Sequence, residues 1–161
     1  MRRELVLGML FAAGALTMSV NALQQPAGRG QAEAAREVMV DKLKDNLYMM
    51  RGGGGNSAVF ITSTGVVVVD TKNPGWGQPL LDKIKSVTDK PVTMIINTHT
   101  HGDHVSGNVE FPATVEVVTH ANTAKNMQEM RPVSGITPPP GQPAPGNIFK
   151  ANNGRGMPKK T

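Results

Sequence analysis

Three of the four histidines in the chain lie within six residues, next to one carboxylate. Residues 99–104 read HTHGDH, which we call the histidine motif. The chain has no cysteine, so thiolate metal sites, disulfides and cysteine nucleophiles are excluded. Neutral imidazole and carboxylate suit Zn, Fe or Mn, and Zn is the most common outcome. These residue types at this spacing therefore predict a metal site.

The spacing within the motif also predicts how its side chains converge. His99 and His101 are two residues apart at the end of an extended segment, so both rings are expected on the same side. Gly102 allows a sharp turn, which brings Asp103 and His104 back toward the same space. The alternative is a polar surface loop that binds no metal. We favour the metal site, because three converging histidines without a metal would repel one another when protonated and would be costly to bury when neutral.

The chemistry of such a site is hydrolytic. A catalytic metal keeps one coordination position open for water and lowers the pKa of that water to about 7. Hydroxide is then available as a nucleophile at neutral pH. The expected place of the loop, at the carboxyl end of a strand, is where α/β sheets bind their ligands.

The elements that must position the motif follow from the pattern of apolar residues. Residues 66–69 and 92–96 are apolar runs typical of strands buried on both faces, and the second leads directly into the motif. Between them, apolar residues of 76–87 recur at helical spacing. The order predicts an α/β fold in which helices cross over a parallel sheet. Strands are expected at 38–40, 47–50, 57–62, 66–69, 92–96 and 114–119, and helices at 76–87 and 121–130.

Three segments together resemble the metallo-β-lactamase-fold hydrolases. They are the motif HTHGDH, the strand VVVVD that ends at Asp70, and the hairpin GGGGNSAVFITSTG. The resemblance covers residues 38 to about 130. It implies an αβ/βα sandwich of two similar halves. The chain is expected to supply only the first half, because no histidine after His104 lies where the family's later ligands would be.

The resemblance also implies a role for each motif residue. His99 and His101 would bind a first metal, and Asp103 and His104 a second, with Asp103 also orienting the hydroxide. Asp70 would support the motif by hydrogen bonding rather than by binding metal. The implied cofactor is Zn²⁺, as one ion or two, with Fe or Mn as alternatives.

Two functions follow as expectations. The first is a zinc-dependent hydrolase in which metal-activated water attacks an ester-like or amide-like bond of a small molecule, such as a β-lactam, a lactone or a thioester. The second is a truncated, inactive metal-binding fragment that needs its missing C-terminal half. Half a sandwich would expose one sheet face, which could mediate self-association. Nucleic acid is not an expected partner, because the basic residues are scattered and the chain has six aromatic residues.

The two ends of the chain differ from its middle. Residues 1–22 resemble a cleaved signal peptide, with Arg2 and Arg3 before an apolar run, which predicts a secreted or periplasmic protein without a stable membrane anchor. A retained anchor is the alternative. Residues 23–37 are expected to be a flexible leader, and residues 131–161 an irregular tail rich in Pro and Gly.

For four features outside the motif, we expect a structural role rather than a direct role in binding or catalysis. The four glycines at 52–55, which we call the glycine turn, predict a hairpin turn near the site mouth rather than a phosphate cradle. His120 is expected to cap a helix rather than bind metal, and Trp76 to pack. Asn97 and Thr98 are expected to support the motif by hydrogen bonds to the backbone.

Overall fold

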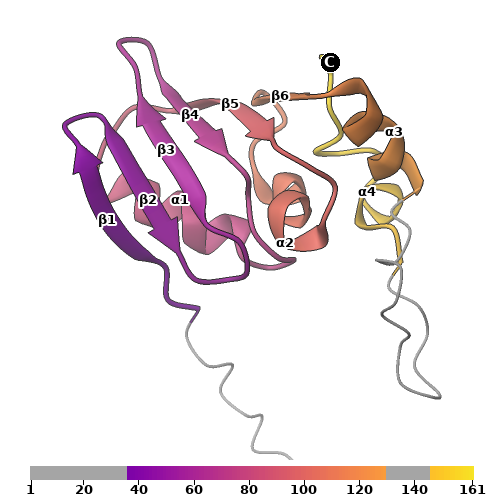
Figure 1. The fold of residues 1–161 in the computed structure, drawn as a ribbon, viewed down its shortest axis with the longest axis horizontal. Helices are drawn as coiled ribbons and strands as arrows, with labels where there is room; N and C mark the ends of the chain where they lie inside the picture. The colour runs from indigo at the N-terminus through magenta and orange to yellow at the C-terminus, as the bar shows by residue number, and fades with distance from the viewer. Residues whose placement is uncertain (1–35, 130–145) are drawn as a thin grey trace, which may run out of the picture. The chain divides into compact units, whose positions relative to one another are not determined.

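The computed structural model describes residues 36–129 and 146–161. The predicted signal peptide, most of the leader and the first part of the tail lie outside these ranges. The described residues form one six-stranded sheet with the strand order β1-β2-β3-β4-β5-β6 (Figure 1). The strands are β1 (Met39–Lys44), β2 (Leu47–Arg51), β3 (Ser57–Ile61), β4 (Val66–Val69), β5 (Val92–Asn97) and β6 (Glu116–Thr119).

The α/β prediction is confirmed, but the sheet is mixed rather than parallel throughout. β1 to β4 form an antiparallel meander, and only β4, β5 and β6 pair in parallel. The short turns between the first four strands permit only antiparallel pairing, whereas the longer segments after β4 and β5 allow crossovers. The helical elements are α1 (Gly77–Lys85), α2 (Gly102–Val105), the 3₁₀ helix η1 (Ser106–Glu110), α3 (Ala121–Glu129) and α4 (Ile148–Ala151).

One face of the sheet packs against α1 and forms the core. Leu80 and Ile84 of α1 are buried against Val59, Val68 and Ile95 of the central strands. The N-terminus of α1 is capped from η1, since the Glu110 carboxylate accepts hydrogen bonds from the backbone N–H groups of residues 75 and 78 at 2.7 and 3.0 Å. This contact ties η1, and with it the end of the histidine motif, to the helix on the core face.

The opposite face of the sheet carries no helix among the described elements (Figure 1). Phe60 of β3 is 42% exposed and Ile96 of β5 is 37% exposed, whereas their neighbours Val59 and Ile95 are fully buried. The prediction that β4 and β5 are buried on both faces is therefore wrong, because helices cover one face only. We call the side with Phe60 and Ile96 the open face.

The last described segment corrects the prediction of an irregular tail. Residues 148–151 form α4, and Phe149 is 1% exposed in a small cluster with Val105 and Met127. Lys160 then forms a parallel bridge with Val118 of β6. Prolines at 138–145 suggested that the tail has no element, yet the segment after them contains an apolar residue that the cluster buries. No described helix is long and apolar enough to cross a bilayer.

Candidate metal centre

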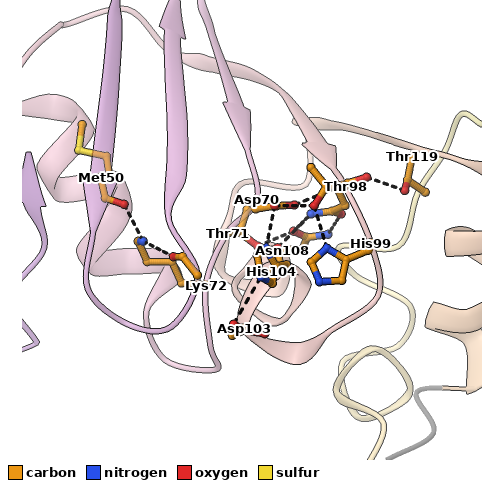
Figure 2. Close-up of polar contacts among 12 residues, drawn as sticks. Met50, Asp70, Thr71, Lys72, Thr98, His99, Asp103, His104, Asn108 and Thr119 are labelled. Atoms are coloured by element: carbon orange, nitrogen blue, oxygen red, sulfur yellow. Dashed lines mark hydrogen bonds and ion pairs between the residues drawn. The ribbon is translucent and has the colours of Figure 1, made fainter. Parts of the chain in front are cut away.

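Asp70 lies directly after β4 and holds two parts of the site together. Its Oδ1 accepts the backbone N–H of Thr98 at 2.9 Å, and its Oδ2 accepts the Thr98 hydroxyl at 2.7 Å (Figure 2). The same Oδ2 lies 2.8 Å from His104 Nδ1. The side chain is reachable because the parallel strands β4 and β5 end at the same edge of the sheet. The predicted supporting role of Asp70 agrees with this geometry.

These contacts determine which histidine nitrogens are free. An ionised carboxylate only accepts, so His104 Nδ1 must donate to Asp70 and leave Nε2 with its lone pair. The Thr98 hydroxyl gives its single proton to Asp70 and can only accept from His99 Nδ1, which lies 2.9 Å away. His99 Nε2 is therefore free as well. A metal-binding histidine typically donates its other N–H in this way, which fixes the orientation of the ring.

The rings of the histidine motif lie together. The centroid of the His99 ring is 4.7 Å from that of His101 and 4.1 Å from that of His104. Asp103 Oδ2 lies 3.4 Å from His104 Nε2. The three rings and the Asp103 carboxylate thus lie near one another, but the ligand atoms of His101 and Asp103 do not join those of His99 and His104 in a group within 4.8 Å.

Within residues 36–129 and 146–161, the tightest group of possible ligands is Asp70, His99 and His104, with one ligand atom of each within 4.8 Å of the others. We regard Asp70 as the anchor of this group rather than a ligand. Its carboxylate accepts three hydrogen bonds and is 5% exposed, so a metal would have to displace existing partners. His101 and Asp103 are outside this tight group.

The chain reversal at the motif differs from the prediction. Gly102 does not have a left-handed φ angle, and the turn is made by one turn of helix, α2, which begins after His101. The backbone N–H of His104 bonds to the carbonyl of His101 at 2.9 Å. The helical turn therefore returns the His104 ring to the other histidines without a glycine-only conformation.

The environment keeps His99 neutral. Partial burial lowers the pKa of His99 below its ordinary value, and the neighbouring His104 and His101 rings lower it further, against an opposing effect of Asp70 and Asp103. A neutral imidazole is the form that binds metal. The electrostatics of the cluster therefore favour coordination at neutral pH.

A network of buried polar side chains, which the sequence did not predict, supports the backbone of the histidine motif. Asn108 of η1 accepts the Thr71 hydroxyl at 2.6 Å and donates to Asn97 Oδ1 at 2.7 Å. The His104 carbonyl accepts from the backbone of Thr71 at 2.7 Å and from Asn97 Nδ2 at 3.2 Å. The predicted support by a hydrogen bond to the backbone is thus confirmed for Asn97, whereas Thr98 supports the motif through the side chains of Asp70 and His99. Nothing in the sequence around Asn108 marks it, because its partners lie far away in the chain.

The glycine turn lies against the motif, as predicted for a turn near the site mouth. A Cβ atom on Gly55 would lie 2.5 Å from His104 Cε1, and one on Gly54 would lie 2.6 Å from Asp103 Cβ. Trp76 packs on the same turn, because a Cβ on Gly53 would lie 2.3 Å from its ring. Side chains at Gly54 and Gly55 would displace Asp103 and His104, and one at Gly53 would displace Trp76. Gly52, Gly53 and Gly54 also have left-handed φ angles, which favour glycine.

His120 lies at the start of α3, where its Nδ1 accepts the backbone N–H of Asn122 at 3.2 Å. The structure thus agrees with the predicted capping role.

Comparison with known proteins finds a matching family model and relatives that align with part of the chain. A family model described as the metallo-beta-lactamase superfamily matches residues 50–154, more than half of the chain. The metallo-beta-lactamase type 2 of Elizabethkingia meningoseptica is 37% identical over 86 residues, which are 44% of this chain and 32% of that protein. The human metallo-beta-lactamase domain-containing protein 1 is 31% identical over 70 residues, which are 42% of this chain and 26% of that protein.

Solved structures share the fold. A metallo-beta-lactamase from Pontibacter korlensis aligns with a TM-score of 0.53 and 25% identity over 58% of this chain and 48% of that chain. A metallo-beta-lactamase from Hirschia baltica aligns with the same TM-score and 23% identity, over 58% of this chain and 48% of that one. The chain thus spans about a quarter to a third of these curated relatives and about half of these solved structures.

Proposed function

Because the chain belongs to the metallo-β-lactamase superfamily, we propose that it is a zinc-dependent hydrolase of small molecules with an ester-like or amide-like bond. The observation that carries the proposal is the anchoring of two histidines by one carboxylate. Asp70 holds the Nδ1 of His104 directly and that of His99 through Thr98, so that both Nε2 atoms are available.

The residues present fit a metal ion. His99 and His104 would supply imidazole nitrogens, joined by the imidazole of His101 and by the carboxylate of Asp103 beside His104, although these two lie outside the tight group. This set of nitrogen and oxygen donors suits zinc, as one ion or two, and also admits iron or manganese. The chemistry that such an ion supplies when bound is a water molecule activated for attack at neutral pH. Asp103 would orient that water, since its carboxylate is a hydrogen-bond acceptor at the same edge.

The proposed substrate class follows from the name of a relative and from the expected location of the protein. The relative from Elizabethkingia meningoseptica has the name of a β-lactamase, and one metal platform of this kind acts on many substrates. We propose a β-lactam, a lactone or a thioester. The apolar segment within residues 1–22 supports a secreted or periplasmic location, where such substrates would be met.

A second candidate is a metal-binding protein that needs a further polypeptide for turnover. The open face favours it, because Phe60 of β3 and Ile96 of β5 are exposed apolar residues of one sheet, on strands that β4 separates. In this case the open face would be covered by protein, and we propose a second copy of the chain as the occupant in the isolated protein.

Elemental analysis and activity assays distinguish the two candidates. The full chain is purified, its bound zinc per chain is measured, and hydrolysis of nitrocefin, a lactone and a thioester is followed. Zinc together with turnover, both lost in His101→Ala and retained in the matched variant His120→Ala, supports the hydrolase. Zinc without turnover supports the second candidate. Absence of zinc under every loading condition contradicts both.

A further inference from the structure

Lys72 is a fully buried lysine beside the metal centre, and the proposed function does not use it. Its side chain is 0% exposed, and its backbone has a left-handed φ angle of 77°. Its Nζ donates to the carbonyl of Met50, at the end of β2, and to the carbonyl of Gly55, each at 2.9 Å (Figure 2). A left-handed lysine is uncommon, so this position is held by its contacts.

The burial of this ammonium group is costly. No carboxylate in the described ranges makes an ion pair with Lys72, and burial lowers its pKa to about 8, against the opposing effect of Asp70. A buried cation is tolerated when its hydrogen bonds are satisfied by fixed partners. Here both partners are backbone carbonyls, one of them in the glycine turn.

The glycine turn is the wall of the site next to the metal-binding atoms. The space that a Cβ on Gly55 would occupy is filled by the His104 ring, and the space beside Gly54 is filled by Asp103. A movement of the turn by about one ångström would therefore free or displace these two side chains, because packed groups have no spare volume.

The first two residues after β4 bond to the histidine motif, and the next two bond to the glycine turn. Asp70 and Thr71 bond to the histidine motif, through His104 Nδ1 and the His104 carbonyl. Lys72 and Asn73 bond to the glycine turn, and the Asn73 backbone N–H donates to the Gly53 carbonyl at 2.9 Å. The left-handed φ angles at residues 70 and 72 allow this short segment to bond to both the histidine motif and the glycine turn.

We propose that Lys72 is a positioning residue, whose buried ammonium group fixes the glycine turn against His104 and Asp103 and thereby sets the position of their metal-binding atoms. The proposal deepens the metal-site proposal above and depends on it for its metal-bound consequence. Lys72 itself cannot touch substrate, because it has no exposed surface.

The first test uses the metal-free protein and is independent of the proposed function. Nuclear Overhauser contacts are measured between the Gly55 Hα protons and the His104 Hε1 proton, which the structure brings together. We expect the contact in the wild-type chain and in Lys90→Met, which removes an exposed lysine that also bonds to a carbonyl, that of Thr62. We expect it to be lost or weakened in Lys72→Met. A contact of unchanged strength in folded Lys72→Met would overturn the proposal.

The second test measures Co²⁺ binding and its visible spectrum in the same three proteins. Loss of a supporting contact behind metal ligands costs roughly 10–100-fold in metal affinity. We expect a loss of this size and an altered spectrum in Lys72→Met, with wild-type behaviour in Lys90→Met. If the wild-type chain binds no Co²⁺, the metal-site proposal fails, and the proton contact alone then decides the role of Lys72.

Gly55→Ala keeps the proposal testable if Lys72→Met does not fold. Gly55 does not have a left-handed φ angle, so alanine changes only the space beside His104. We expect this variant, with Lys72 intact, to show the same altered Co²⁺ spectrum. A folded Gly55→Ala protein with the wild-type spectrum and affinity would show that the turn does not set the site, and the proposal would be wrong.

Discussion

Asp70 Oδ2 lies 2.8 Å from His104 Nδ1, although 34 residues separate them in the chain. Through the Thr98 hydroxyl, the same oxygen also determines the proton position on His99. One buried carboxylate at the end of β4 therefore orients two imidazoles of the candidate metal centre. The hydrogen bonds of Asp70 therefore join the residues that follow β4 to the histidine motif that follows β5.

Asp70→Asn is expected to weaken metal binding roughly 10–100-fold. Asparagine can still accept one hydrogen bond, but it lacks the charge and the second acceptor oxygen that hold Thr98 and His104 together. Competition against a chromophoric zinc chelator measures the affinity. Asp82→Asn on the exposed side of α1 is the matched control and should bind as the wild type does. Equal affinities in both variants would contradict the anchoring role of Asp70.

The metal-free protein is expected to lose stability as the pH falls through and below 6.5, the ordinary pKa of histidine. Partial burial and the neighbouring histidines hold the pKa of His99 below 6.5 in the folded state. Between 6.5 and the lower folded value, the unfolded chain binds more protons, so the free energy of unfolding decreases as pH decreases through that window. Urea unfolding at several pH values checks this. The pH dependence should be shallower in His99→Gln, and a dependence as steep as that of the wild type would contradict the prediction.

Phe149→Ala is expected to destabilise the folded protein by about 3–5 kcal/mol, as truncation of a buried aromatic side chain does. Phe149 packs with Val105 and Met127, so its loss leaves a cavity behind the element that carries His104. Urea unfolding measures the effect. Leu43→Ala, at an exposed position of β1, should change stability by less than about 0.5 kcal/mol. Similar small effects of both variants would show that the last described segment does not belong to the folded unit.

Phe60→Lys is expected to reduce self-association of the chain. Phe60 lies on the open face, and a charge there opposes burial against a second copy. Sedimentation velocity over a range of concentrations gives the association constant. Val40→Lys is the matched control. Val40 pairs with Met50, so its side chain is on the same side of the sheet as that of Met50, opposite the open face. A protein that is monomeric before any substitution, or that associates equally in both variants, would contradict the proposed occupant of the open face.

The sequence alone determined the fold class, the order of the six strands with α1 and α3, and the position of the histidine motif after a strand. These features depend on local spacing: apolar periodicity marks β4, α1 and β5, and the motif places three imidazoles within six residues. The four glycines at 52–55 likewise predicted a turn near the site.

Only the tertiary structure decided which histidine nitrogens are free, what Lys72 holds, that Asn108 lies under the motif, and that Phe149 joins the core. Each depends on contacts between groups at least 17 residues apart, such as Lys72 with Gly55 and Thr71 with Asn108. The parallel pairing of β4 with β5 brings their carboxyl ends to one edge, and the antiparallel meander brings the glycine turn beside them. These contacts cannot be predicted from the local sequence, because the packing of the whole sheet brings the residues together.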